Sequence, residues 1–254
     1  FVKNAPLAEV KALLTSQGLP TDYIDVPFTP FVVIAGGRKV LIDTGLGDFG
    51  GPNAGKLLEN LRAAGVPASD IDTVLISHFH GDHINGLRNK AGELAFAKAK
   101  VMVPAAEYAF WMDDAKMAAA PAGQKGAFEN ARRTFSAMGP DMLVQFAAGA
   151  EVVPGIRSVA AYGHTPGHTL FEVTSAGQSF FYLADLTNVP SLIALNPDWA
   201  VSFDMDAEAA RKVRREVFAR VTSSKSRVGG FHFPFPAFGR MTATGNGYTF
   251  EPTV

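Results

Sequence analysis

Three of the chain's six histidines lie within six residues, in the stretch H-F-H-G-D-H that runs from His78 to His83. The other three are His164, His168 and His232. Neutral imidazole is the commonest metal ligand at physiological pH. A histidine cluster that also contains an aspartate, at the end of an apolar strand, indicates one wall of a metal site, because scattered surface histidines would not gather in this way.

The spacing within the cluster indicates two groups of donors. His78 and His80 are two residues apart, so they can point the same way from an extended segment and bind one cation. Asp82 and His83 follow directly, where the loop can turn them towards a second cation. Further donors stand later in the chain, at His164 and Asp185. A mixture of imidazole and carboxylate donors suits zinc or a similar first-row metal better than calcium or magnesium.

The composition bounds the class of protein. A chain of 254 residues with 47% hydrophobic residues can bury a substantial core, and we expect one domain over residues 1–254. The net charge of −1 gives no electrostatic basis for nucleic-acid binding. No apolar run reaches the roughly 18 residues of a membrane helix. The absence of cysteine excludes disulfides and thiolate zinc sites.

Apolar periodicity and turn residues place the elements that must position these donors. Helices are expected where apolar residues recur three or four apart, and strands where short apolar runs end at turn residues. The expected helices cover 6–17, 53–64 (capped by Asn53), 104–113, 124–138 and 206–221, with a flexible loop at 118–123. The expected strands cover 31–35, 39–43, 72–77, 100–103, 155–162, 169–174, 179–183, 228–232, 241–244 and 248–251. Strands followed by helices in both halves predict an α/β protein with mixed sheets.

The histidine cluster resembles the H-x-H-x-D-H motif of the metallo-β-lactamase superfamily, and the other landmarks of that superfamily follow in order. The stretch from Ile42 to Gly45 is similar to its early D-T-G at a strand end. The later landmarks are His164 in G-H-T-P-G-H, Asp185 and His232. The resemblance covers nearly the whole chain and is far more specific than one motif. It implies the αββα sandwich fold, in which two mixed β-sheets are flanked by helices.

The resemblance also implies a site for two divalent metal ions, for which zinc is expected. Carried over by position, one metal takes His78, His80 and His164, and the other takes Asp82, His83 and His232. Asp185 bridges the two metals. Asp43 and His168 would orient the ligands and set the histidine tautomers. The implied activity is hydrolysis by a hydroxide that bridges the metals, with Asp82 and Asp185 as the catalytic carboxylates.

Departures from the patterns of individual branches narrow the activity. Asp185 argues against the class B3 β-lactamases, which usually lack the bridging aspartate. His80 argues against the redox site of flavodiiron oxidoreductases, which place a glutamate at this position. Asn188 stands where acyl-homoserine lactonases typically have a tyrosine. This difference weakens that assignment, and acyl-homoserine lactonase activity stays as the alternative. The chain is most similar to the methyl parathion hydrolase branch, through stretches such as G-H-T-P-G-H-T and H-F-P-F-P. Members of that branch hydrolyse phosphotriesters and often esters or lactones.

Two hypotheses follow for the function. The first is a dinuclear metal-dependent hydrolase that cleaves a small-molecule ester, lactone or phosphotriester, and the intact ligands favour it. The second is a family member that binds metals without efficient turnover. Phe49, Trp111 and Phe128 lie where this branch places aromatic residues near the leaving group, so we expect them to line an apolar substrate pocket. The alternative for these three residues is a place in the core.

The partners and the cellular location of the protein are expected by analogy with the same branch. Neither a nucleic-acid partner nor a membrane partner is expected, and a homodimer is expected by analogy. A periplasmic or secreted location is favoured over a cytoplasmic one, because export is common in this branch. The chain opens at Phe1 rather than methionine, which fits the removal of a leader.

Overall fold

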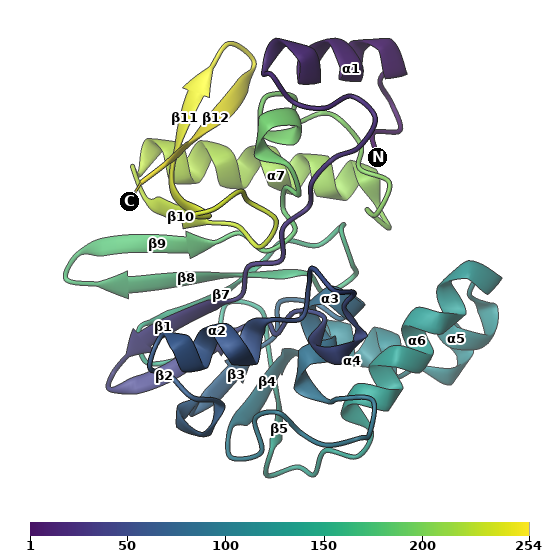
Figure 1. Ribbon diagram of the computed structural model, residues 1–254, viewed down its shortest axis with the longest axis vertical. Coiled ribbons are helices and arrows are strands. Elements are labelled where there is room, and N and C mark those ends of the chain that lie inside the picture. The colour runs from purple at the N-terminus through teal and green to yellow at the C-terminus, as the bar shows by residue number, and fades with distance from the viewer. Residues whose placement is uncertain (254) are drawn as a thin grey trace. The chain divides into compact units, whose positions relative to one another are not determined.

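The structure is a computed structural model that describes residues 1–253 (Figure 1). The backbone packs into two compact units. Unit 1 combines Phe1–Thr29 with Val159–Val254, and unit 2 is Pro30–Ser158. The expectation of one domain over residues 1–254 stays a prediction. The expected fold class is confirmed, because the described residues form two mixed β-sheets with flanking helices.

Unit 2 is built on a five-stranded sheet with the order β1-β2-β3-β4-β5. Its strands are β1 (Phe31–Ala35), β2 (Arg38–Ile42), β3 (Thr73–Leu75), β4 (Lys100–Pro104) and β5 (Leu143–Phe146). β1 and β2 form an antiparallel hairpin, and the remaining neighbours are parallel. The hairpin turns at Gly36 and Gly37, whose φ angles of 57° and 76° suit a two-residue turn in which both residues are left-handed.

The parallel strands of unit 2 determine where its chemical groups emerge. Ile42 pairs in register with Leu75, so β2 and β3 end at the same edge of the sheet. Both residues are fully buried, as expected for parallel strands whose two faces are covered. The backbone N–H of Asp43 donates to the carbonyl of Leu75 at 2.9 Å. The segments that follow β2 and β3, from Asp43 and from Ile76, therefore begin side by side.

The helices of unit 2 differ in two places from the expectation. They are α2 (Leu57–Ala63), α3 (Gly81–Ile84), α4 (Ala105–Trp111), α5 (Asp114–Ala119) and α6 (Ala122–Phe135), with 3-10 turns η1 (Gly47–Phe49), η2 (Ala68–Asp70) and η3 (Asn85–Leu87). The predicted cap at Asn53 is wrong, since α2 begins after Lys56 and no side chain caps it. The loop expected at 118–123 is largely helical, because Asp113 caps α5 and only residues 120–121 separate α5 from α6. α6 packs against α3, α4 and α5 (Figure 1).

The second sheet has seven strands in the order β12-β11-β10-β9-β8-β7-β6, and β7 contains the division between the units. Its strands are β6 (Glu151–Val153), β7 (Ile156–Ala160), β8 (Thr169–Ser175), β9 (Gln178–Tyr182), β10 (Arg227–Gly229), β11 (Phe238–Thr244) and β12 (Gly247–Pro252). β9 and β10 are parallel, while β8–β9, β10–β11 and β11–β12 are antiparallel. The sequence patterns do not indicate β5 or β6, which are among the shorter strands.

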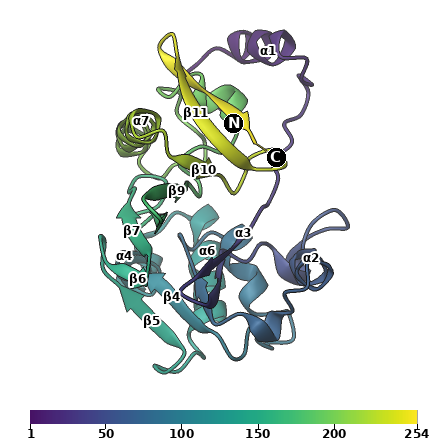
Figure 2. The same cartoon turned by 90° about the vertical axis from the view of Figure 1, so that its left-hand side faces the viewer.

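The long helix of unit 1, α7 (Ala207–Ser223), begins as the sequence predicts. The carboxylate of Asp206 accepts the backbone N–H groups of Glu208 and Ala209, which is the role of an N-cap aspartate. The helix packs against β11. In Figure 2 it is seen end-on beside β10 and β11.

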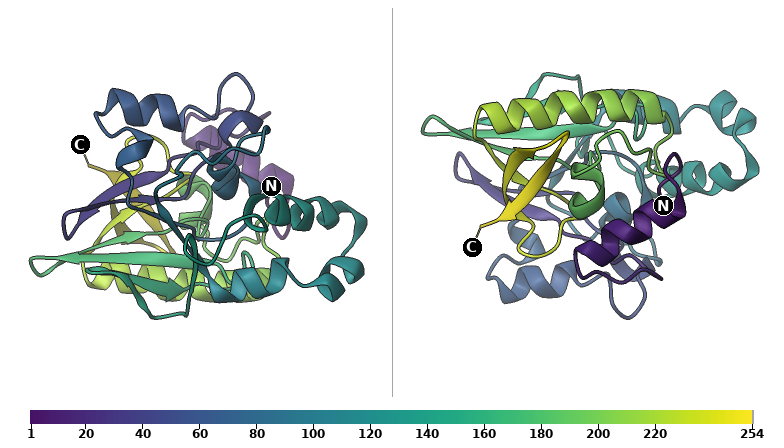
Figure 3. Two further views of the ribbon diagram at one scale, coloured as in Figure 1. Left: turned by 90° about the horizontal axis from the view of Figure 1, so that it is seen from below. Right: turned by 90° about the horizontal axis from the view of Figure 1, so that it is seen from above.

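The N-terminal helix α1 (Leu7–Ser16) lies against a π-helical turn, η4 (Pro190–Ala194). Val10 and Leu14 of α1 share a hydrophobic cluster with Leu192 and Ile193 of η4. The right-hand view of Figure 3 shows α1 and η4 next to each other. Among residues 1–253, none of the helices combines the length and the hydropathy that crossing a membrane requires.

Phe135 is a suitable probe of the core of unit 2. Its ring is fully buried and stacks on Phe79 with a centroid distance of 4.3 Å. Phe135→Ala is therefore expected to lower the free energy of unfolding by about 3–5 kcal/mol, measured by urea denaturation. Ile34→Ala is the control, since Ile34 is 72% exposed and its loss should change stability by about 0.5 kcal/mol or less. Equal losses for both variants would contradict the assignment of Phe135 to the core.

Candidate metal centre

The segment after β3 carries the first two histidines of unit 2. It runs from Ser77 to His80, directly before α3. His78 Nε2 lies 3.1 Å from His80 Nδ1, and His78 Nδ1 lies 3.0 Å from Ser77 Oγ. The Ser77 hydroxyl donates its hydrogen to Asp43, so its oxygen accepts from His78 Nδ1. The Nε2 atom of His78 is thereby left to face His80.

The next two donors, Asp82 and His83, lie in α3, and His83 is linked to Asp43. Asp82 Oδ2 lies 3.5 Å from His83 Nε2. His83 Nδ1 donates to Asp43 Oδ2 at 2.8 Å, because an ionised carboxylate only accepts. Asp43 also accepts from the backbone and the hydroxyl of Ser77, at 2.8 and 2.7 Å. Asp43 thus contacts His83 as an orienting carboxylate would, and its role stays a prediction.

Asp43 holds this position in an uncommon backbone conformation. Its φ angle is 58°, in the left-handed region that costs a non-glycine residue free energy. The side chain is fully buried, and both of its oxygens are engaged by Ser77 and His83. These bonds offset the backbone cost. The D-T-G stretch is therefore a turn that directs one carboxylate at the histidine segment.

In unit 1, one carboxylate oxygen of Asp185 lies close to both donor histidines. Asp185 Oδ2 lies 3.3 Å from His164 Nε2 and 3.1 Å from His232 Nε2. The amide of Asn188 donates to the same oxygen at 3.0 Å. All four residues are buried. An oxygen shared in this way by two imidazole nitrogens stands where a bridging ligand would stand.

The far nitrogens of these histidines are held by acceptors that carry no hydrogen. His164 Nδ1 donates to Asp204 Oδ1 at 3.0 Å. His232 Nδ1 donates to the backbone carbonyl of Pro27 at 2.7 Å. Because the hydrogen is fixed on Nδ1, the lone pair of each ring is on Nε2, which is the atom that faces Asp185.

His168 occupies a different position from the other histidines of unit 1. Its Nδ1 donates to the carbonyl of Ala161 at 2.9 Å, and its Nε2 accepts the backbone N–H of Asp185 at 3.2 Å. These two bonds engage both ring nitrogens. His168 therefore holds the backbone at Asp185, and the orienting role expected for it stays a prediction.

These distances test whether the residues fit metal ions. Two ligands of a tetrahedral zinc ion, each bound at about 2.0–2.1 Å, lie about 3.3–3.4 Å apart. The four donor pairs within the units are separated by 3.1, 3.5, 3.3 and 3.1 Å. Each pair spans the edge of a tetrahedron of this size. Imidazole with carboxylate is also the donor chemistry of zinc and similar metals, so the residues fit divalent cations.

Asp204 and Arg214 belong to this site although no sequence pattern indicates them. Arg214 is only 1% exposed, and its guanidinium donates to Asp204 Oδ2 at 3.2 Å and to the carbonyl of Leu186 at 2.7 Å. It also donates to the carbonyls of Pro197 and Trp199, both at 3.0 Å. The guanidinium therefore ties three loop segments of unit 1 to one point.

The Asp204–Arg214 pair connects the donors of unit 1 to α7. Asp204 bonds to His164 with one oxygen and to Arg214 with the other, while Arg214 holds the residue that follows Asp185. Burial lowers the pKa of the Arg214 guanidinium, and the charge of Asp204 acts in the opposite direction. A buried arginine that lost this carboxylate would be strongly destabilising. Neither partner can therefore be removed alone without a loss of stability, and the pair fixes the ring of His164.

Glu107 is a third residue that sequence patterns miss. Its fully buried carboxylate lies on α4, where Oε2 accepts the backbone N–H of Phe79 at 2.9 Å and the indole N–H of Trp111 at 2.7 Å. Phe79 stands between His78 and His80, so this carboxylate fixes the backbone of the histidine segment. The spacing of Glu107 and Trp111 on one helix could suggest their contact, but not the contact with Phe79.

The three aromatic residues predicted to line a pocket have different surroundings. Trp111 and Phe128 are 2% and 1% exposed, belong to the core of unit 2, and have ring centroids 4.7 Å apart. The Trp111 ring also lies 6.3 Å from the ring of His80. Phe49 is part-buried, with the Arg133 guanidinium 4.4 Å from its ring centroid. Packing accounts for Trp111 and Phe128, and the pocket role of the three residues stays a prediction.

Asp204→Asn tests whether this carboxylate supports a metal ligand. The variant removes the charge that fixes His164, so we expect its metal affinity to fall about 10- to 100-fold, measured by competition with a chromogenic chelator. Asp198→Asn is the control, because Asp198 is exposed and bonds to Arg215 instead. Circular dichroism of both apo variants checks that they are folded. An unchanged affinity in folded Asp204→Asn would contradict the assignment.

Glu107 allows a paired test of hydrogen bonding at the histidine segment. Glu107→Ala leaves the Phe79 N–H and the Trp111 indole buried without an acceptor, which costs about 1–3 kcal/mol for each group. Glu107→Gln keeps an acceptor oxygen and should retain more of the stability. Urea denaturation of the two variants measures the difference. A Gln variant as unstable as the Ala variant would show that the charge, and not the hydrogen bonds, matters.

Comparison with known proteins agrees with this geometry. A family model described as the metallo-beta-lactamase superfamily matches residues 27–228. AidC, a dizinc quorum-quenching lactonase solved with a product, is 27% identical, with 100% of this chain and 88% of that chain covered and a TM-score of 0.93. AbOPH, a hydrolase in the beta lactamase superfamily, is 26% identical, with 100% and 89% covered and a TM-score of 0.93. A probable metal-dependent hydrolase from Staphylococcus aureus shares the fold at 21% identity, with 100% and 91% covered and a TM-score of 0.78. A search of curated proteins found no match.

The family model spans most of the chain and both of its units. It confirms the family predicted from the histidine cluster, while the methyl parathion hydrolase branch stays a prediction. With two mixed sheets, flanking helices and a set of histidine and aspartate donors, the chain has the fold of a metal-dependent hydrolase and belongs to the metallo-β-lactamase superfamily.

Proposed function

We propose that this protein is a dinuclear metal-dependent hydrolase that cleaves small esters, lactones or phosphotriesters. The observation that carries the proposal is the position of Asp185, whose Oδ2 faces the Nε2 atoms of both His164 and His232. A carboxylate oxygen with one imidazole on either side is what a bridging ligand between two cations requires.

The seven donors divide between the proposed cations as the superfamily pattern implies. One cation takes His78, His80 and His164, the other takes Asp82, His83 and His232, and Asp185 bridges them. Two such cations would supply a nucleophilic water at neutral pH and a Lewis acid for the oxygen under attack. Zinc is the proposed metal, because the donors are imidazoles and carboxylates, and AidC is a dizinc enzyme.

The chain's own residues then have distinct roles. Asp43, Ser77 and Asp204 hold the hydrogens on the far side of the ligand histidines, so that the near nitrogens keep their lone pairs. The side chain of Asp82 is 23% exposed, whereas that of its neighbour His83 is fully buried. Asp82 is therefore the carboxylate that substrate and solvent reach, and we assign it the transfer of a proton to the leaving group.

Lactones are the first substrates to test. AidC, which is similar over the whole of this chain, is a lactonase. Acyl-homoserine lactones are therefore included as the alternative substrate, although Asn188 replaces the tyrosine typical of such enzymes. Esters and phosphotriesters follow from the proposed methyl parathion hydrolase branch. A homodimer and a periplasmic or secreted location are proposed on the same analogy.

The proposal is tested by metal analysis together with a substrate panel. We expect two equivalents of divalent metal per chain and turnover of at least one of an aryl ester, a lactone, an acyl-homoserine lactone and a phosphotriester. Asp185→Ala should lose the second equivalent and lower kcat at least about 100-fold, because a direct ligand is lost. Asp114→Ala is the control, since that side chain is 93% exposed and distant in sequence. Two bound metals without turnover of any substrate would favour the alternative of a member without efficient turnover.

A further inference from the structure

Unit 1 contains an apolar cavity of about 210 Å³ that has His232 in its wall. The opposite wall comes from the N-terminal part of the chain, with Leu14 of α1 and Ile24 of the segment that follows it. Val189 and Ser191, at the start of η4, also line the cavity. His232, a proposed metal ligand, therefore also forms part of the wall of this cavity.

The cavity touches two of the three loops that carry the donors of unit 1. Val189 directly follows Asn188, whose amide bonds to Asp185, and Pro234 lies two residues after His232. Pro27, which also lines the cavity, accepts the hydrogen bond from His232 Nδ1. A molecule in this cavity would therefore lie against the residues that hold the donors in place.

The lining selects for an aliphatic occupant. Apart from His232, Asp25 and Ser191, the walls are leucine, isoleucine, valine, tyrosine and four prolines, at positions 20, 27, 190 and 234. Prolines fix the backbone and give the cavity a stable shape. The volume of about 210 Å³ exceeds the roughly 150 Å³ that accepts a benzene molecule, but it is below the roughly 300 Å³ at which pockets for whole ligands begin. It suits one part of a substrate, such as a chain.

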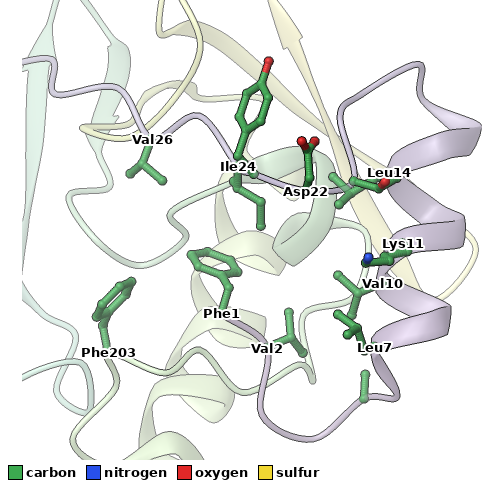
Figure 4. A pocket seen from close by; sticks show the side chains of 13 residues that line it. Phe1, Val2, Leu7, Val10, Lys11, Leu14, Asp22, Ile24, Val26 and Phe203 are labelled. Carbon is green, nitrogen blue, oxygen red and sulfur yellow. The ribbon is translucent and has the colours of Figure 1, made fainter. Parts of the chain in front are cut away.

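A second, larger cavity of about 370 Å³ lies beside the first (Figure 4). Leu14, Tyr23 and Ile24 line both cavities, so they form the partition. Figure 4 shows Phe1 and Phe203 on the side of the larger cavity away from α1. Neither His232 nor any residue of η4 lines it. The larger cavity therefore provides a control for effects on the smaller one.

We propose that the smaller cavity binds the unbranched aliphatic acyl chain of the substrate. This inference rests on the proposed hydrolase function and narrows it, because it makes medium-chain acyl lactones or esters the substrates. Each methylene that enters an apolar wall gains about 0.8 kcal/mol, which corresponds to about three- to fourfold in kcat/KM. The reacting group remains at the donors, and the chain passes His232 and Val189.

The test uses a series of acyl lactones with chains of four, six, eight and ten carbons. Ser191→Phe fills the smaller cavity from a half-buried position. The backbone carbonyl at this position accepts a hydrogen bond from Gln17, and the substitution leaves that bond in place. Thr21→Phe is the matched control, because Thr21 lines only the larger cavity. Binding of decanoate, measured by calorimetry on the metal-loaded protein, gives a second measurement that does not depend on turnover.

We expect kcat/KM of the unaltered protein to rise with chain length. Ser191→Phe should lower the ten-carbon value at least tenfold and the four-carbon value less than threefold, and should weaken decanoate binding. Thr21→Phe should change each less than twofold. An equal rise with chain length in Ser191→Phe, or equal effects of the two variants, overturns the inference while the hydrolase proposal stands. Decanoate binding that Ser191→Phe weakens, together with no turnover of any ester, lactone or phosphotriester, keeps the assignment of the cavity and rejects the hydrolase proposal.

Discussion

A histidine that offers one ring nitrogen to a metal carries a hydrogen on its other nitrogen, and in a buried site that hydrogen needs an acceptor. This requirement accounts for much of the buried polar structure of both units. Asp43 accepts from His83, Asp204 accepts from His164, and the carbonyl of Pro27 accepts from His232. Each acceptor lies far from its histidine in sequence. The fold is therefore needed to set the tautomers before any cation is bound.

The acceptors in turn impose demands on the structure around them. Asp204 is buried and charged, so Arg214 is buried with it and bonds to three carbonyls besides. Asp43 takes a left-handed backbone conformation that its hydrogen bonds offset. Asp43 directly follows β2, and Asp204 lies two residues before the N-cap of α7, so both carboxylates turn inward without interrupting a strand or a helix. Stability and ligand geometry thus depend on the same residues.

Local patterns were sufficient to predict most strands, because the relevant residues are neighbours in sequence. The proposed donors follow from a family motif, and their role stays a prediction. Asp204 and Arg214 could not be predicted in this way, since Asp204 is 40 residues from His164 and belongs to no motif. β5 and β6 escape the patterns because they are short, and α5 forms where small residues suggest a loop. For an aromatic residue such as Trp111, the sequence cannot distinguish a place in the core from a place beside the metal ligands. Trp111 is buried in the core and its ring also lies near His80.

We propose, as the central claim, that the seven histidine and aspartate donors hold two divalent cations with Asp185 between them. The most direct test is a crystal structure of the zinc-loaded protein with anomalous scattering measured at the zinc edge. The account predicts two peaks per chain, one beside His78, His80 and His164 and the other beside Asp82, His83 and His232, both within bonding distance of Asp185. A single peak, or peaks bound by other residues, would contradict it.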